Sequence, residues 1–411
     1  MKQSIYNIPF SSKGVNYLYN SLSGSIIKMK SDNIFNDSND IDFLCKHGFI
    51  VDKSINETLE YKYIYYKQAF NNNTISLNIL PTEACNLSCS YCFEGDKKIK
   101  RMNKGTCDSI VKFLKGQKQK KIHITWFGGE PLLEFNTILY ITEQLKSYDI
   151  KFGTSLITNG TLLTENICKH LDSLNLEYIQ ITFDGLKQIH DKKRFFSNGG
   201  GTFDVIINNI NRLITETKIN LNIQVNIDRN NYTSYESIWK LFQEKFPNEI
   251  ENKRIQIGFN RVQDRTNFDK NNICISDEEF YNVLNYYSNL ESGAKQSIHI
   301  PSINLPCMLR TINSFVIGAD GSIYKCLEHA GKTKMSIGNI SNFEISRKKH
   351  ANYMFAHDPF NDEQCLKCAI LPICGGGCPI DRKNKMLGKL DNLCPYIKTN
   401  ITNLIIQSLH L

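Results

Sequence analysis

The sequence lacks any long apolar run. None of its hydrophobic stretches reaches the roughly 18 residues that a membrane-spanning helix needs. The opening residues, MKQSIYNIPF, also lack the apolar segment of a secretory signal. We therefore expect a cytoplasmic protein without a membrane partner.

Internal repeats, low-complexity tracts and proline-rich linkers are likewise missing. The 411 residues are 41% hydrophobic and 22% charged, which is ordinary globular composition and excludes a wholly disordered chain. This length suggests two or three domains. The net charge is +8, but lysines alternate with acids along the chain. We interpret this as a solvated surface and expect no nucleic-acid partner.

Cysteine, in contrast, is abundant, with 14 residues. In a long chain without a secretory signal the thiols should stay reduced, so clustered cysteines indicate metal binding rather than disulfides. Their distribution divides the chain into residues 1–75, 76–300 and 301–411. Only one cysteine, Cys45, lies in the first segment, and seven lie in the last.

The middle segment alternates strand-like apolar runs with amphipathic stretches, a pattern typical of parallel βα units. Such units can close fully or partly into a barrel whose functional loops follow the strand C-termini. Cysteines or glycine-rich turns follow the first four predicted strands, as this arrangement requires. The predicted strands cover residues 75–80, 121–127, 152–158, 178–183, 221–227 and 254–259.

Cys85, Cys89 and Cys92 follow the first predicted strand with the spacing C-x3-C-x2-C. Three thiolates in one short loop cannot complete a four-coordinate site, so a zinc ion would need a distant fourth ligand. A [4Fe–4S] cluster would instead keep one iron open for a small chelating ligand. A zinc knuckle is the alternative.

This spacing, with Tyr91 before the last cysteine, resembles the radical S-adenosylmethionine (SAM) superfamily. The resemblance implies an α/β fold with a partial (β/α)6 barrel, in which the open iron of the cluster binds SAM. Cleavage of SAM then gives a 5′-deoxyadenosyl radical that abstracts hydrogen from the substrate.

Further motifs at the strand ends strengthen the resemblance. The segment WFGGEP resembles the family's GGEP motif, which implies that its backbone and Glu130 receive the amino group of SAM. ITFDG, followed by HDKKR, implies that Thr182 contacts SAM and that Arg194 pairs with its carboxylate. ITNG also matches. No general base can be assigned. The implied SAM-binding residues are Tyr91, Gly128, Gly129, Glu130, Pro131, Asn159, Thr182 and Arg194.

The seven cysteines after residue 300 exceed one four-coordinate site and suit two, with one position left open. Two structural zinc ions are the alternative. The pattern resembles the SPASM domain, an extension of radical SAM enzymes that holds two auxiliary [4Fe–4S] clusters. The resemblance assigns Cys365, Cys368, Cys374 and Cys394 to an outer cluster and Cys307, Cys326 and Cys378 to an inner one. Cys274 could complete the inner set.

The N-terminal segment predicts a small α+β module. Runs at 15–19 and 25–29 flank the turn SLSG and indicate a hairpin, and residues 40–46 and 55–70 indicate helices. Such a module could capture an extended peptide by strand addition, or it could be a scaffold. It resembles, more loosely than the cysteine motifs do, the winged-helix-like leader-peptide-recognition domain of peptide maturases.

Together the resemblances imply a radical SAM/SPASM maturase of a ribosomally synthesised peptide. The expected reaction is oxidative thioether formation from a cysteine of the precursor's core, with an auxiliary cluster accepting the electron. Flavodoxin or ferredoxin is the expected type of electron donor.

Three alternatives stay open for the reaction. One is an anaerobic sulfatase-maturing enzyme that forms formylglycine, although Leu327 stands where that branch places an acid and Glu328 comes one residue later. Another is carbon–carbon cross-linking of a peptide. The third, from a different class, is a non-enzymatic iron–sulfur or zinc interaction protein.

Overall fold

A computed structural model describes residues 1–30, 41–92, 99–117, 120–263, 272–290, 293–294, 303, 306–390, 393–409 and 411. The chain divides into two compact units. Unit 1 comprises Met1–Asn71, Asp277–Ile312 and Ala351–Leu411, and unit 2 comprises Asn72–Ser276 and Asn313–His350. The division into residues 1–75, 76–300 and 301–411 stays a prediction. No helix in the described ranges has the length and apolarity needed to cross a bilayer.

Unit 2 is built around a parallel sheet whose strands follow one another in chain order. The strands lie within two residues of the six predicted ones, which confirms the α/β fold with a central parallel sheet. They are β6 (Thr74–Ile79), β7 (Lys121–Trp126), β8 (Phe152–Thr158), β9 (Leu176–Phe183), β10 (Asn220–Ile227) and β11 (Ile255–Arg261).

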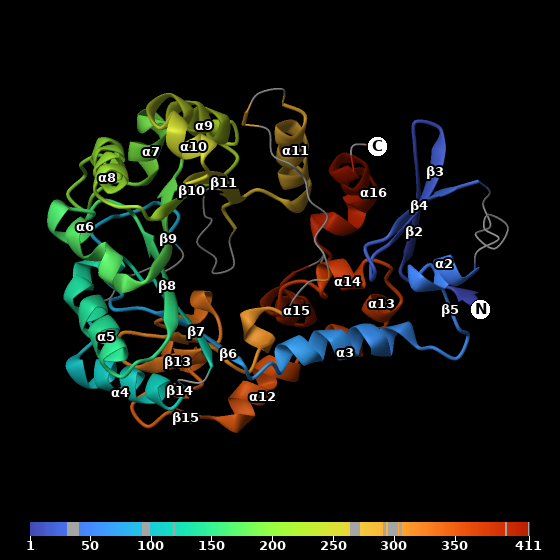
Figure 1. Ribbon diagram of the computed structural model, residues 1–411, viewed down its shortest axis with the longest axis horizontal. Coiled ribbons are helices and arrows are strands. Elements are labelled where there is room, and N and C mark those ends of the chain that lie inside the picture. The colour runs from blue at the N-terminus through green and yellow to red at the C-terminus, as the bar shows by residue number, and fades with distance from the viewer. Residues whose placement is uncertain are drawn as a thin grey trace. The chain divides into compact units, whose positions relative to one another are not determined.

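Helices connect these strands and lie along the outer side of the arc that the strands form in Figure 1. They are α4 (Lys104–Lys115), η1 (Pro131–Glu134), α5 (Phe135–Ser147), α6 (Glu165–Leu171), η2 (Asp172–Leu174), α7 (Lys187–Lys193), α8 (Phe203–Glu216), α9 (Ser234–Lys245) and α10 (Pro247–Glu251).

The two faces of this sheet differ in polarity. Along β9 and β10, fully buried residues such as Ile181 and Val225 alternate with half-buried polar ones such as Thr182 and Gln224. Successive side chains of a strand point to opposite faces, so one face packs against the helices and the other carries polar groups. A filled barrel would have branched apolar side chains on its inner face. The polar inner face therefore indicates that this side of the sheet binds a ligand.

The sheet continues beyond β6 with strands that the sequence did not predict. β12 (Ser314–Ile317) pairs parallel to β6, and β13 (Ser322–Tyr324), β14 (Gly338–Asn339) and β15 (Glu344–Ile345) follow antiparallel. The 3-10 turns η4 (Leu327–His329) and η5 (Thr333–Met335) lie between β13 and β14. Cys326 thus lies two residues after β13, and β13 belongs to the same sheet as β6, which precedes the first cysteine loop.

The N-terminal part of unit 1 contains the predicted hairpin. β3 (Val15–Asn20) and β4 (Ile26–Met29) pair antiparallel, and β2 (Asn7–Ser12), which was not predicted, adds a third strand beside β3. β1 (Lys2–Gln3) pairs with β5 (Ile50–Val51). The two predicted helices are present as α2 (Ile41–Lys46) and α3 (Glu57–Ala69).

The remaining described residues of unit 1 form helices and short turns. They are α11 (Asp277–Ser288), η3 (Met308–Arg310), η6 (Pro359–Asn361), α13 (Glu363–Leu366), α14 (Leu371–Cys374), α15 (Pro379–Met386) and α16 (Tyr396–Leu409), while α12 (Arg347–Phe355) contains one boundary between the units.

The N-terminal sheet and the C-terminal helices of unit 1 share a hydrophobic core. Ile8 and Phe10 of β2 pack in one cluster with Ile373, Ile401 and Ile405. Because a small module can bury too little apolar surface by itself, this shared core supplies its stability.

Candidate functional site

The first cysteine loop begins six residues after β6 ends. Its three thiols, Cys85, Cys89 and Cys92, are half-buried and form no disulfide. Backbone hydrogen bonds hold the loop against the segment that follows α7: the amides of Ser88 and Ser90 donate to the carbonyls of Phe195 (2.9 Å) and Lys193 (3.1 Å). The loop is therefore anchored beside Arg194, 102 residues after Cys92 in the chain.

Gly128 and Gly129, after β7, allow a close approach of two backbones. A Cβ atom at Gly128 would lie 2.3 Å from the carbonyl oxygen of Thr82, and one at Gly129 would lie 2.3 Å from that of Ala84. Gly128 also has a φ of 124°, which favours glycine. The amide of Glu130 donates to the Ala84 carbonyl at 2.9 Å. The glycine pair thus fixes the start of the cysteine loop.

The side chain of Glu130 is fully buried and accepts three hydrogen bonds. One carboxylate oxygen accepts from the Thr158 hydroxyl (2.8 Å) and the Leu132 amide (3.0 Å), and the other accepts from the Asn159 amide (2.7 Å). Burial raises the pKa of Glu130, while these donors act in the opposite direction. In the described structure Glu130 joins the end of β7 to the end of β8, and Pro131 begins the turn η1 behind it.

Asn159 connects this junction to the first cysteine loop. Its side-chain amide donates to the Asn86 side chain at 2.9 Å and lies 3.8 Å from the sulfur of Cys85. Its side-chain oxygen accepts from the hydroxyl of Thr161 at 2.6 Å, and that hydroxyl also accepts from Asn86 at 2.8 Å. The predicted residues Glu130 and Asn159 therefore lie together with Cys85.

Tyr91 is at the centre of a second buried polar network. Its hydroxyl lies 2.6 and 2.8 Å from the two oxygens of the Asp184 carboxylate, to which it donates. The same hydroxyl accepts from Arg194 (3.1 Å) and Asn226 (3.3 Å). Burial raises the pKa of Asp184 to about 6, against the charge of Arg194, which lowers it. Tyr91 and Arg194, which were predicted separately as SAM-binding residues, are thus in direct contact.

Arg194 retains one free donor in this network. Its Nε–H is buried and has no hydrogen-bond partner among the residues that the structure describes. Thr182, on β9, is half-buried on the polar face of the sheet two residues before Asp184. A buried guanidinium with an unsatisfied N–H beside an anchored cysteine loop fits a carboxylate ligand.

Asp184 and Asn226 are the residues of this network that the motifs did not single out. Asp184 stands inside the quoted motif ITFDG, whereas Asn226 lies near the end of β10 without any local signal.

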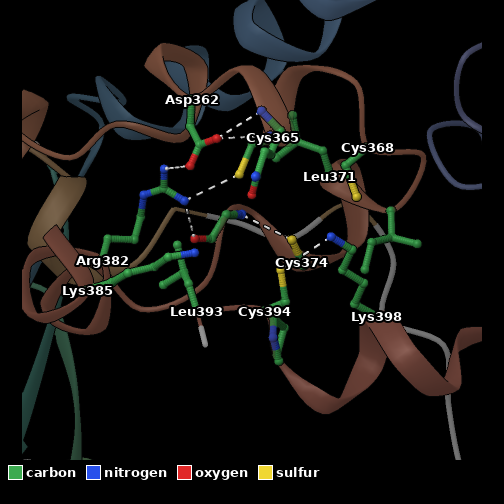
Figure 2. A pocket seen from close by; sticks show the side chains of 14 residues that line it. Asp362, Cys365, Cys368, Leu371, Cys374, Arg382, Lys385, Leu393, Cys394 and Lys398 are labelled. Atoms are coloured by element: carbon green, nitrogen blue, oxygen red, sulfur yellow. Dashed lines mark hydrogen bonds and ion pairs between the residues drawn. The ribbon is translucent and has the colours of Figure 1, made fainter. Parts of the chain in front are cut away.

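In unit 1, the four cysteines of the predicted outer set line one pocket. Cys365 lies in α13 and Cys368 in the turn after it. Cys374 ends α14, and Cys394 lies two residues before α16. The four side chains face a common space (Figure 2). Burial raises the pKa of the Cys374 thiol to about 11. A cluster with four cysteine ligands would require these thiols as thiolates.

The predicted inner set is divided between the units, with Cys307 and Cys378 in unit 1 and Cys326 in unit 2. This set stays a prediction, as does the role of Cys274. Within the described ranges no three His, Cys, Asp or Glu side chains are arranged to hold a single metal ion.

Comparison with known proteins identifies the core of unit 2. Residues 79–231 match the radical SAM superfamily. The chain carries a radical SAM domain. The match begins at the end of β6 and ends past β10, so it includes the cysteine loop, the glycine pair and the Tyr91 network. The family implies a [4Fe–4S] cluster with SAM, and the three half-buried thiols and the unpaired Nε–H of Arg194 fit that pair. The non-enzymatic alternative is therefore wrong.

Curated relatives extend the similarity beyond this core. A cysteine-type anaerobic sulfatase-maturating enzyme of Clostridium perfringens is 28% identical over 337 residues, which cover 76% of this chain and 90% of the relative. The radical SAM cyclopropyl synthase TigE of Paramaledivibacter caminithermalis is 25% identical over 405 residues, covering 87% of this chain and 80% of that protein.

Solved structures share the fold. The native enzyme anSMEcpe, bound to SAM and the peptide Cp18Cys, has a TM-score of 0.60 at 23% identity and covers 82% of this chain and 99% of its own. SuiB of Streptococcus suis, bound to its precursor peptide SuiA, has a TM-score of 0.59 at 14% identity and covers 96% of this chain and 99% of its own.

Proposed function

We propose that this radical SAM enzyme matures a ribosomally synthesised peptide by linking a cysteine sulfur to a carbon of another residue. Both curated relatives named above and both structural neighbours support a peptide or protein substrate. The SuiB match spans 96% of the chain, so it must include most of the first 71 residues. The N-terminal module therefore has a counterpart in a protein that was solved with its precursor peptide.

The observation that carries an oxidative reaction is the four-cysteine pocket in unit 1. Four thiolates would occupy every iron of a [4Fe–4S] cluster and leave none open to a substrate. Such a cluster can exchange electrons but cannot bind the reacting group. An electron acceptor in addition to the SAM-binding loop is what an oxidised product requires.

The electron balance of thioether formation is consistent with a SAM-binding loop and a separate electron acceptor. A carbon–sulfur bond forms while one C–H and one S–H bond break. The cluster and SAM, when bound, supply the 5′-deoxyadenosyl radical that takes one hydrogen atom. The thiol proton would pass to solvent or a base, and an auxiliary cluster, held by Cys365, Cys368, Cys374 and Cys394, would accept the one remaining electron.

Formylglycine formation on a sulfatase is the second candidate, favoured by the 28% identity to the Clostridium perfringens enzyme. Against it, Leu327 follows Cys326 and begins the turn η4, which displaces the nearest acid, Glu328, by one position. Along a 3-10 turn, consecutive side chains point about 120° apart, so Glu328 points in a different direction from Leu327.

We propose that the leader of the precursor binds the N-terminal sheet. A hollow there is lined by Asn7, Pro9 and Ser11 of β2 and by Asn16 of β3, together with Met29. Exposed polar side chains with a proline at the sheet edge suit an extended peptide better than a packed helix.

Point substitutions test this role better than removal of the module, because its removal would uncover the shared core at Ile373 and Ile405. Asn16→Lys places a long side chain in the hollow and should weaken leader binding at least tenfold in fluorescence anisotropy. Leu59→Ser is the matched control, since Leu59 lies on α3 of the same module and is 59% exposed. Equal affinities of the two variants would overturn the assignment of the hollow.

The chemistry is tested by anaerobic co-expression with a short cysteine-containing peptide encoded beside the enzyme. Thioether formation removes two hydrogens, so the peptide should lose about two mass units per cross-link together with one alkylatable thiol. The same loss with all thiols retained would indicate a carbon–carbon link. An aldehyde that reacts with a hydrazide would indicate formylglycine, and the Cys89→Ala enzyme should give none of these products.

A further inference from the structure

Arg382 of α15 occupies one side of the outer cysteine pocket and is fixed from four directions. Its guanidinium donates to the sulfur of Cys365 (3.4 Å), to the carbonyls of Gly376 (3.1 Å) and His357 (2.7 Å), and to the Asp362 carboxylate (2.8 Å). The side chain is almost completely buried. Its position is therefore set by the fold rather than by solvent.

Lys398 of α16 approaches the pocket from the other side (Figure 2). Its ammonium group lies 3.4 Å from the sulfur of Cys394. Within the part of the chain that the structure describes, no carboxylate pairs with it. Unlike Arg382, Lys398 is largely exposed.

We propose that Arg382 and Lys398 are positioning residues that hold the thiolates of Cys365 and Cys394 and raise the reduction potential of the outer cluster. This inference rests on the proposed outer cluster. A cluster with four thiolate ligands carries net negative charge, and one added electron makes it more negative. Hydrogen bonds to the sulfurs and nearby positive charge both favour the reduced form.

The two residues act in different ways. Asp362 pairs with Arg382 and offsets its charge, so Arg382 contributes through a fixed hydrogen bond to sulfur. The same carboxylate accepts from the amides of Gln364 and Cys365, which orients the first ligand as well. Lys398 contributes an uncompensated charge, reduced by solvent screening.

The positions of Arg382 and Lys398 favour electron transfer from the substrate to the outer cluster. In thioether formation one electron leaves the substrate, and the acceptor cluster gains it. Hydrogen bonds and positive charge from Arg382 and Lys398 make this transfer more favourable, and loss of either residue would make it less favourable.

The test uses the full chain with its other cluster cysteines changed to alanine, so that only the outer set can bind iron. The changed residues are Cys85, Cys89, Cys92, Cys307, Cys326 and Cys378. In this background we expect about four irons per chain after anaerobic reconstitution. Absence of bound iron would refute the outer cluster itself, which distinguishes failure of the proposed function from failure of this inference.

Lys398→Gln should make reduction of the cluster about tenfold less favourable, or about 59 mV for a one-electron couple, in a potentiometric titration followed by electron paramagnetic resonance. Lys398→Arg should restore most of the potential. Lys385→Gln is the matched control, because Lys385 is an exposed lysine of the same pocket that donates to no described cysteine. At equal iron content, equal potentials for Lys398→Gln and Lys385→Gln would overturn the role of Lys398.

Arg382→Lys keeps the charge but loses the planar fork, so it should lower the potential without a change in net charge. An unchanged potential in this variant would overturn the role of Arg382. If the variant does not fold, Arg382→Gln combined with Asp362→Asn removes both members of the ion pair and gives the same comparison.

Discussion

Gly129→Ala should disrupt the first cysteine loop although it adds only one methyl group. The new Cβ would lie 2.3 Å from the carbonyl oxygen and 2.6 Å from the carbonyl carbon of Ala84, the residue before Cys85. Both atoms belong to the backbone, so no side-chain rotation can relieve the contact. The two loops must separate by about 1 Å to reach ordinary van der Waals distance.

The expected cost follows from this geometry. Overpacking of this kind costs about 1–3 kcal/mol. Separation of the loops also weakens the hydrogen bond from the Glu130 amide to Ala84, worth about 1 kcal/mol. A total of about 3 kcal/mol corresponds to a decrease in Tm of roughly 6–12 °C for a unit of this size.

Gly258→Ala is the control for this prediction, because a Cβ at Gly258, on β11, would meet no atom within 4 Å. Tm of both variants is measured by circular dichroism, and SAM cleavage by chromatography of 5′-deoxyadenosine. We expect Gly129→Ala to lose stability and at least tenfold in cleavage rate, and Gly258→Ala to match the unaltered chain. Indistinguishable variants would refute the close-approach argument.

Three further predictions concern other parts of the molecule. Tyr91→Phe leaves the buried Asp184 carboxylate without its hydroxyl donor, so Tm should fall by an amount equivalent to about 2 kcal/mol. The variant should also bind SAM more weakly in calorimetry. An unchanged Tm and an unchanged SAM affinity would contradict the role of this network. Burial lowers the pKa of His190 to about 3, from an ordinary value of 6.5. As the pH falls, the imidazole is therefore protonated in the unfolded chain before it is protonated in the folded chain. Folding stability is lost as the pH falls from 6.5 toward 3. Between pH 6.5 and 5.0 the loss should be about 2 kcal/mol in urea unfolding, and His190→Gln should not show it. Ile405→Ala should cost about 2–4 kcal/mol and weaken leader binding while uncoupled SAM cleavage persists; equal leader affinity would show that the shared core does not support the module.

The strands of the central sheet could be predicted because alternation and apolar runs are local properties of the sequence. The same holds for the β3–β4 hairpin, whose turn is formed by SLSG. β12 was missed because it is only four residues long and follows a stretch without clear periodicity. Its place beside β6 depends on pairing with a strand more than 230 residues earlier, which no local pattern encodes.

The sequence by itself determined the chemistry of this protein, because ligand spacing and glycine pairs are short-range features that directly limit what can bind. Three cysteines in one loop predict a cluster with one open iron, and the WFGGEP and ITFDG motifs predict the residues around SAM. The tertiary structure decided the partners of those residues. Only the fold brings Asp184 and Asn226 to Tyr91, buries Glu130 completely between two strand ends, and places Arg382 and Lys398 on opposite sides of four thiols. Such contacts join residues that are far apart in the chain, and their energies depend on burial and distance rather than on sequence spacing.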